Sequence, residues 1–247
     1  MTALGWALIT GASRRIGRAL ALAAAASGYD IIVHGRSSAD ADDTAGEVRA
    51  LGRAAVVALA DLADPAAAKC LIAAGPSPPR LLVNCASLFH DDAIETLDVA
   101  DWDATLAANL TAPILLAQAF ASALPPDAQG LIVNIIDQRV WRLNPKFFSY
   151  TISKSALWTA TQTLAQAFAP RIRVNAIGPG PTLASIHQSP ETFAAEAAAT
   201  PLGRAVYPQE IADALRYLIA ARSVTGQMIA VDAGQHLAWR TPDVVDD

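Results

Sequence analysis

The chain has 247 residues, of which 53% are hydrophobic, and no shift in composition divides it, so we expect one domain over residues 1–247. Its formal net charge of −5, without any run of Lys or Arg, argues against nucleic acid and anionic membranes as partners. Cys70 and Cys85 lack the spacing of a disulfide framework or a thiolate metal site. We see no export signal and no apolar run long enough to span a membrane, and therefore expect a cytoplasmic protein that binds small molecules.

Short runs rich in Ile and Val alternate with longer alanine-rich stretches, which is typical of parallel strands joined by crossover helices. Seven strands are predicted, at residues 6–10, 30–34, 54–60, 81–84, 131–136, 172–177 and 228–232. Helices are predicted between them, at residues 16–27, 39–51, 65–74, 101–123, 150–168 and 208–221. Residues 178–208 show no clear period, and we expect them to form a mobile lid.

The predicted strands are almost continuously apolar, which indicates that helices cover both faces of the sheet. We therefore predict an α/β fold, a Rossmann-type doubly wound parallel sheet of about seven strands. Ligands of such sheets bind outside the carboxyl ends of the strands, and each of the following motifs lies at such an end.

The first predicted strand runs into a glycine-rich turn, "LITGASRRIGRAL". Glycines permit the tight turn, and the N-terminus of the next helix offers N–H groups to a pyrophosphate. We predict that this turn binds a dinucleotide through Gly11, Ser13, Arg14, Arg15, Ile16 and Gly17. Arg15 replaces the usual middle glycine and is a candidate ligand for both a cofactor phosphate and the substrate; the alternative is a solvated surface arginine.

The segment after the second strand, "HGRSS", predicts which nicotinamide cofactor is bound. A free ribose 2′-hydroxyl calls for Asp or Glu at this place, whereas a 2′-phosphate calls for Arg and hydroxyl groups. The phosphate ligands are predicted to be Arg36, Ser37 and Ser38, with Arg14 as a second cation, so the expected cofactor is NADPH. Asp61 and Leu62, after the third strand, are placed at the adenine; alternatively, Asp61 caps the following helix.

Tyr150 and Lys154 are four residues apart, so their side chains share one face of a helix. A free tyrosine has a pKa of about 10 and handles protons near neutrality only beside a cation. Lys154 supplies that charge and is also suited to hold the ribose hydroxyls of the cofactor. The alternative is an ordinary pair on the surface of a helix.

Several motifs in this order resemble the short-chain dehydrogenase/reductase family over nearly the whole chain. They are the glycine-rich turn, "NCAS" at 84–87, Asn109, Tyr150-x-x-x-Lys154 and "NAIGPG" at 175–180. The resemblance implies that Asn109 anchors a water in a proton relay and that the enzyme is a homotetramer or homodimer built through the helices at 101–123 and 150–168. It adds these cofactor ligands: Asn84, Ala86, Ser87, Tyr150, Pro179, Gly180 and Thr182.

Within that family, "TGASRRIGR", "HGRS" and "NCASLF" are similar to segments of pteridine reductases and dihydromonapterin reductases. Asp137 strengthens this resemblance, because most members of the wider family have serine there. A serine hydroxyl donates to a carbonyl oxygen, which a carboxylate cannot do unless it is protonated. The resemblance implies that Asp137 feeds protons through Tyr150 to a ring nitrogen of a pterin. The alternative is that Asp137 only braces its loop and that the enzyme reduces a carbonyl compound.

The predicted substrate ligands are Arg15, Ser87, Phe89, Asp137 and Tyr150. Phe89 presents a flat apolar face on which a heterocycle can stack, or else is an ordinary core residue. Instead of contacting a ligand, Ser87 could form a turn and Thr182 could cap a helix. The four histidines, His34, His90, His187 and His236, have no metal-ligand spacing, so we assign them no catalytic role and predict no metal. The tail with Trp239 and Arg240 packs at a subunit interface or is a frayed end.

The sequence therefore predicts an NADPH-dependent reductase that converts a dihydropterin to its tetrahydro form. Its catalytic residues are predicted to be Asp137, Tyr150, Lys154 and Asn109. One alternative is a carbonyl reductase of the 3-oxoacyl thioester type. Another is a non-catalytic NADPH-binding regulator, which would be expected to have lost Tyr150, Lys154 or Asn109, yet all three are present.

Overall fold

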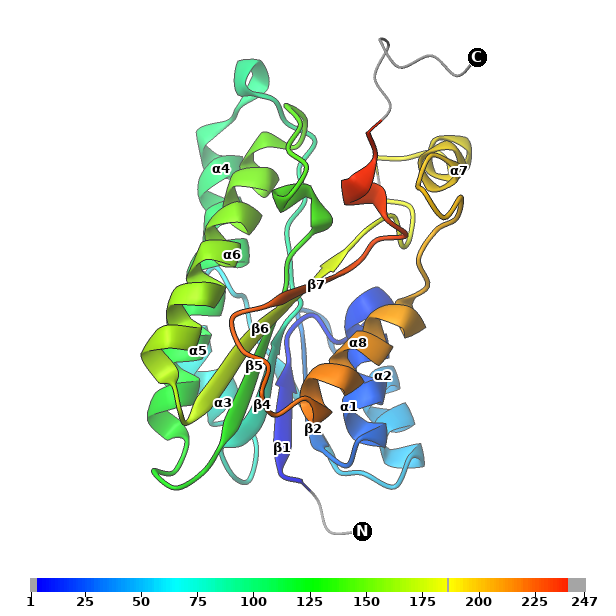
Figure 1. Cartoon of the computed structure of the whole chain (residues 1–247). Helices are drawn as coiled ribbons and strands as arrows, with labels where there is room; N and C mark the ends of the chain where they lie inside the picture. The colour runs from blue at the N-terminus through cyan, green and yellow to red at the C-terminus, as the bar shows by residue number, and fades with distance from the viewer. Residues whose placement is uncertain (1–3, 186, 240–247) are drawn as a thin grey trace, which may run out of the picture.

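One parallel sheet organises the computed structural model, which describes residues 4–185 and 187–239 (Figure 1). The sheet has seven strands in the order β3-β2-β1-β4-β5-β6-β7. Their bounds are β1 Trp6–Ile9, β2 Asp30–Gly35, β3 Ala55–Leu59, β4 Pro79–Asn84, β5 Gly130–Ile135, β6 Ile172–Pro179 and β7 Met228–Val231. The strand order reverses between β1 and β4, so the predicted doubly wound fold is confirmed.

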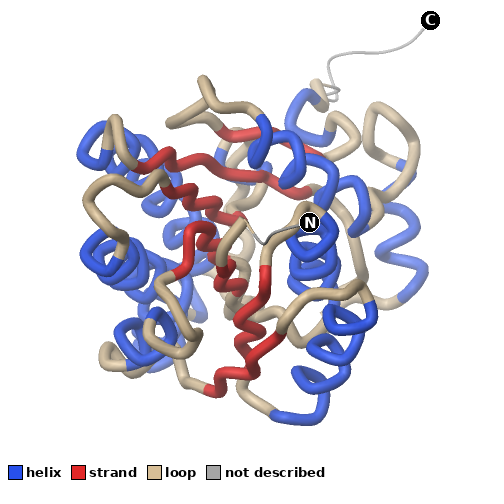
Figure 2. Tube along the Cα trace, turned by 90° about the horizontal axis from the view of Figure 1, so that it is seen from below, coloured by secondary structure: helices blue, strands red, loops and turns tan. Residues whose placement is uncertain are grey.

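Helices cover both faces of the sheet, as Figure 2 shows. Their bounds are α1 Arg15–Ala26, α2 Ser38–Ala50, α3 Ala67–Ile72, α4 Val99–Leu106, α5 Ala112–Ala123, α6 Phe148–Phe168, α7 Pro190–Ala198 and α8 Pro208–Ala220. Successive residues of a strand point to opposite faces, so Ala7 and Ile9 pack with α1, α2 and α8, whereas Trp6 and Leu8 pack with α3, α5 and α6. Two apolar cores therefore hold the sheet in place.

The helix predicted at 101–123 is interrupted by a π-helical turn at Ala107–Thr111, between α4 and α5. The stretch Val99–Ala123 is long and apolar enough to cross a membrane. It instead forms part of the core, because Leu116, Ala117 and Phe120 on α5 are almost fully buried against the sheet. Its apolar character reflects packing on a sheet face.

No helix was predicted within residues 178–208, yet α7 lies there. The Ser189 hydroxyl accepts a hydrogen bond from the Thr192 N–H at 3.2 Å, and Pro190 occupies the first helical turn. Both are ordinary helix-start signals. The apolar period is weak because Ala197 is the one residue of α7 that is buried. Mobility of this segment stays a prediction.

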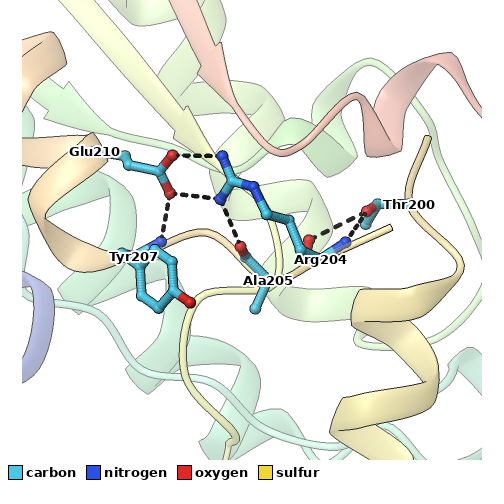
Figure 3. Close-up of polar contacts among 5 residues, drawn as sticks. All are labelled: Thr200, Arg204, Ala205, Tyr207 and Glu210. Atoms are coloured by element: carbon cyan, nitrogen blue, oxygen red, sulfur yellow. Dashed lines mark hydrogen bonds and ion pairs between the residues drawn. The ribbon is translucent and has the colours of Figure 1, made fainter. Parts of the chain in front are cut away.

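Polar contacts hold the connection from α7 to α8 (Figure 3). The Glu210 carboxylate accepts from the Tyr207 N–H at 2.8 Å and from the Arg204 guanidinium at 2.7 and 2.9 Å. The ion pair with Arg204 lowers the pKa of Glu210 to about 2. The Thr200 hydroxyl accepts from the Arg204 N–H at 3.2 Å, so the segment before α8 is held at both ends.

Candidate active site

The glycine-rich turn after β1 leaves no room for side chains at its glycines. Gly11 has φ +64°, and a Cβ there would lie 2.9 Å from the Ala86 Cα. A Cβ on Gly17 would lie 2.0 Å from the Gly11 carbonyl oxygen. Arg15 itself has φ 54°, a conformation that favours glycine. The turn is therefore shaped as a backbone cradle at the start of α1, as a pyrophosphate requires.

The phosphate-binding candidates lie beside this cradle. A cavity of about 310 Å³ separates the turn from α2 and is lined by Ser13, Arg14, Arg15, Arg18, Asp40, Asp43, Thr44 and Glu47. Arg18 is paired with Glu47. Arg36 and Ser37 are exposed between β2 and α2, and the Ser37 hydroxyl makes no capping hydrogen bond to α2, which Ser38 opens. These groups fit a 2′-phosphate.

Other predicted cofactor ligands lie along the same edge of the sheet with different partners. The Asp61 carboxylate accepts from the Ala63 N–H at 3.0 Å, which is a turn contact, and its adenine contact stays a prediction. Leu62 beside it is buried. The Asn84 amide donates to the Asn134 side chain at 2.8 Å, so it faces β5. The Ala86 N–H donates to the Thr10 hydroxyl at 3.1 Å.

The segment after β6 closes this edge. A Cβ on Gly180 would lie 2.6 Å from the Asp232 Cα, so the backbone passes very close to the end of β7. Pro179 is the last residue of β6. The Thr182 hydroxyl, which is buried, donates to the Gly180 carbonyl at 3.0 Å and does not cap a helix. Cofactor contacts of this segment stay predictions.

Tyr150, Lys154 and Asp137 are brought together at the end of β5. The Tyr150 hydroxyl donates to the Asp137 Oδ2 at 3.0 Å, and the Arg139 N–H donates to Asp137 Oδ1 at 2.8 Å. Lys154 Nζ donates to the Ile135 carbonyl at 2.9 Å and lies 5.6 Å from the centre of the tyrosine ring. Asp137 therefore both braces its loop and faces the phenol.

Burial sets the protonation of this cluster. It raises the pKa of Asp137 from its ordinary value, and together with the Asp137 carboxylate it raises the pKa of Tyr150 well above 10. Burial also lowers the pKa of Lys154 to about 8. Near neutral pH, Tyr150 is accordingly a protonated phenol that is hydrogen-bonded to a carboxylate. The cluster can pass protons between Asp137 and Tyr150.

Asn109 lies inside the π-helical turn and is fully buried. Its carbonyl oxygen accepts from the Leu88 N–H at 2.8 Å and from the Ser87 hydroxyl at 3.1 Å. Its amide donates to the Leu88 carbonyl at 2.9 Å and to the Ser153 hydroxyl at 3.2 Å. Asn109 thus joins the loop after β4 to the catalytic helix α6, and its role as a water anchor stays a prediction.

An aromatic wall stands beside Tyr150. The Phe89 ring stacks on the Phe147 ring with centroids 4.4 Å apart and meets the Tyr150 ring edge-on at 4.7 Å. The Arg139 guanidinium lies 5.0 Å from the centre of the Phe147 ring. Phe89 therefore lies beside Tyr150 and is not a member of the sheet cores, and its contact with a substrate stays a prediction. Phe147 was missed from the sequence, although two phenylalanines, Phe147 and Phe148, stand at the start of α6.

Two contacts connect the site to the segment before α7. The Arg15 guanidinium donates to the carbonyls of Leu183 and Ala184 at 3.1 and 3.0 Å, so it is exposed yet not free in solvent. The His187 ring nitrogen Nε2 lies 3.2 Å from the Phe89 carbonyl oxygen. His187 was given no role from the sequence, and nothing local to it indicated its place at the edge of the site.

Asp92, in the loop after β4, is a second residue that the sequence analysis missed. Its buried carboxylate accepts from the Ser149 N–H at 3.2 and 3.3 Å, and its backbone carbonyl accepts from the Phe148 N–H at 3.2 Å. The residue before α6 is Phe147, which has no capping side chain. Asp92 therefore caps the helix that carries Tyr150 from a distance of 57 residues along the chain.

Comparison with known proteins shows the family of the chain. The family model described as enoyl-(acyl carrier protein) reductase matches residues 11–236, and the chain belongs to this family of short-chain dehydrogenases/reductases. It is similar to the crystal structure of FolM alternative dihydrofolate reductase 1 from Brucella suis in complex with NADP, with 50% identity and a TM-score of 0.93 over 99% of this chain and 100% of that chain.

Curated relatives have other activities. Galactitol 2-dehydrogenase (L-tagatose-forming) from Cereibacter sphaeroides is 36% identical over 94% of this chain and 95% of its own length. A 3-oxoacyl-[acyl-carrier-protein] reductase from Synechocystis sp. is 34% identical over 92% of this chain and 95% of its own length. The family alone therefore does not select a substrate.

Proposed function

We propose that this protein is an NADPH-dependent oxidoreductase that reduces a dihydropterin to a tetrahydropterin. The observation that carries the proposal is the hydrogen bond from the Tyr150 hydroxyl to the Asp137 carboxylate. The similar structure from Brucella suis is that of an alternative dihydrofolate reductase in complex with NADP. It supports the cofactor by its bound NADP, and it supports the substrate class because dihydrofolate contains a dihydropterin ring.

The residues present fit NADPH. The cradle around Gly11 and Gly17 suits the pyrophosphate, and Arg14, Arg36 and Ser37 suit the 2′-phosphate. Lys154 lies where it can hold ribose hydroxyls beside Tyr150. When bound, the nicotinamide supplies a hydride.

Asp137 and Tyr150 account for the proton of the reaction. Reduction of a C=N bond adds a hydride to the carbon and one proton to the nitrogen. Tyr150 keeps its proton because its pKa is raised, and its hydroxyl is positioned to deliver it. After Tyr150 has given up its proton, the Asp137 carboxylate, whose pKa is raised, takes up a proton from solvent and passes it to the phenolate oxygen.

The carbonyl reductase alternative has support from the 34% identical 3-oxoacyl-[acyl-carrier-protein] reductase. In such a reaction the tyrosine hydroxyl donates to the substrate carbonyl oxygen. Here an ionised carboxylate lies beside that hydroxyl, and its charge repels a developing oxyanion. The pterin assignment therefore fits the site better. A non-catalytic regulator fits it less well, since the intact Tyr150 and Lys154 contacts would then have no use.

A substrate panel on wild type and Asp137→Ser tests the proposal. We expect wild type to oxidise NADPH with dihydromonapterin, dihydrobiopterin or dihydrofolate and to be inactive with acetoacetyl thioesters. Asp137→Ser should lose pterin turnover by about 10²-fold, the usual contribution of a proton-transfer group. Turnover of acetoacetyl thioesters by wild type, without response to any pterin, would show that the carbonyl reductase alternative is correct.

We also propose a homotetramer or homodimer that forms through the helices α4, α5 and α6, and a cytoplasmic location. Ile114 on α5 and Ile152 on α6 support the interface, because these apolar side chains are 37% and 41% exposed in the single chain. The predicted interface role of the tail rests in part on Arg240, which lies outside the described residues. Trp239 is exposed.

A further inference from the structure

His34 is a buried histidine that the proposed chemistry does not use. It lies near the end of β2 and is 2% exposed. Its Nδ1 accepts a hydrogen bond from the Gly11 N–H at 3.1 Å, and its Nε2 lies 3.2 Å from the Ala60 carbonyl oxygen. A backbone N–H only donates and a carbonyl only accepts, so the ring must be neutral with its proton on Nε2.

The contacts of His34 join the ends of three strands. Gly11 opens the glycine-rich turn after β1, and Ala60 follows β3. The Ala12 N–H also donates to the His34 backbone carbonyl at 2.8 Å. Two successive N–H groups of the turn are therefore fixed by one residue of β2, immediately beside the place where the dinucleotide is expected.

The ring has surroundings that keep it neutral. Burial lowers the pKa of His34; among nearby charges Arg36 acts in the same direction and Asp61 in the opposite direction. A protonated ring would point an N–H at the Gly11 N–H. The turn is packed closely at this point, because a Cβ on Gly11 would lie 2.9 Å from the Ala86 Cα.

We propose that His34 is a positioning residue for NADPH, which holds the start of the phosphate-binding turn in place by accepting from the Gly11 N–H. This inference rests on the NADPH binding proposed above. It predicts that losing the acceptor weakens NADPH binding more than it weakens the fold, because an unpaired buried N–H drives the turn to rearrange.

Two substitutions separate the two hydrogen bonds of the ring. In His34→Asn, the amide oxygen takes the place of Nδ1, so the contact to Gly11 is kept and that to Ala60 is lost. In His34→Gln, the amide nitrogen takes the place of Nε2, so the contact to Ala60 is kept and that to Gly11 is lost. If His34 only stabilised the fold, the two variants would bind NADPH with the same affinity.

NADPH affinity measured by fluorescence titration decides between these outcomes. We expect the Kd of His34→Gln to rise about tenfold, that of His34→Asn to stay within about threefold of wild type, and kcat at saturating NADPH to be unchanged in both. His34→Leu, which also lacks the acceptor, should behave like His34→Gln and replaces it if that variant does not fold. Wild-type affinity in the variants without the acceptor, or equal weakening in His34→Asn, would overturn the inference.

The NADPH titration also distinguishes the proposed pterin reductase function from the proposed role of His34. Failure of every pterin as substrate, with NADPH affinity intact in wild type and reduced in His34→Gln, would overturn the proposed function and leave the role of His34 standing. Failure of wild type to bind NADPH would overturn both.

Discussion

Tyr150 is the residue on which both the pterin and the carbonyl alternatives depend, because each needs its hydroxyl as the proton donor. We predict that Tyr150→Phe lowers kcat by about 10²- to 10⁴-fold, the range for loss of a general acid. NADPH affinity should stay within about twofold, since the hydroxyl bonds to Asp137 and not to the glycine-rich turn. Steady-state kinetics with an NADPH titration checks this, and a variant of near wild-type kcat would mean that protons reach the substrate by another route.

Asp137 is expected to reduce the stability of the fold in return for its chemistry. Its pKa is raised in the folded state, so the folded chain holds this proton more tightly than the unfolded chain does. The stabilisation is complete below the ordinary value of 3.8 and is lost as pH rises through the raised pKa. At neutral pH the buried carboxylate therefore opposes folding, even with Lys154 and Arg139 nearby.

We predict that Asp137→Asn is inactive with pterins yet more stable than wild type near pH 7.5. The gain should be about 1 kcal/mol, or roughly 2–4 °C in melting temperature. Thermal unfolding from pH 7.5 to pH 4 checks this, because the advantage should shrink as Asp137 takes up its proton. A constant difference between the two proteins across this range would contradict the assignment.

The start of α6 depends on a residue from another element. Phe147, just before the helix, has φ 54°, and Asp92 supplies the cap. We predict that Asp92→Ala destabilises the protein by about 1 kcal/mol, the usual cost of a lost cap, and lowers kcat because Tyr150 follows directly. Asp92→Asn keeps an acceptor oxygen and should recover most of both losses in thermal unfolding and kinetics. Equal loss in the two variants would indicate that the charge matters and not the hydrogen bond.

The helix α7 is joined through Glu196 to the short helical turn at Gln235–Leu237. Figure 1 shows both at the same end of the molecule. The Glu196 carboxylate accepts from Gln188 at 2.6 Å and from Gln235 at 3.0 Å. We predict that Glu196→Ala raises KM for the pterin severalfold and leaves KM for NADPH unchanged, because α7 follows the segment that touches Arg15 and Phe89. Glu191→Ala removes the same charge from an exposed position and should leave both KM values as in wild type.

The whole molecule should be stabilised by the cofactor that it binds. At a concentration 100 times its Kd, NADPH should add about 2.7 kcal/mol to the free energy of unfolding, which corresponds to roughly 5–10 °C in melting temperature. NADH at the same concentration should have a smaller effect, because Arg14, Arg36 and Ser37 then have no 2′-phosphate to bind. Equal shifts in a thermal-shift assay would contradict the NADPH assignment.

Much of the fold could be predicted because the signals are local. Each strand is a short apolar run, the strands inside the sheet are mostly buried, and all seven predicted strands are present. The catalytic tyrosine and lysine are one helical turn apart, so one helix is enough to align them. The sequence by itself therefore determined the parallel sheet, the family and the edge at which the site lies.

Only the tertiary structure decided which distant groups meet. Asp92 caps α6, His34 accepts from Gly11, and Arg15 reaches the segment before α7, each across 23 or more residues of sequence. None of these contacts has a periodic signal, because each depends on how parallel strands place their carboxyl ends side by side. The same is true of Asp137: its residue type was visible in the sequence, but the burial that raises its pKa and the hydroxyl it accepts from come only with the packed fold.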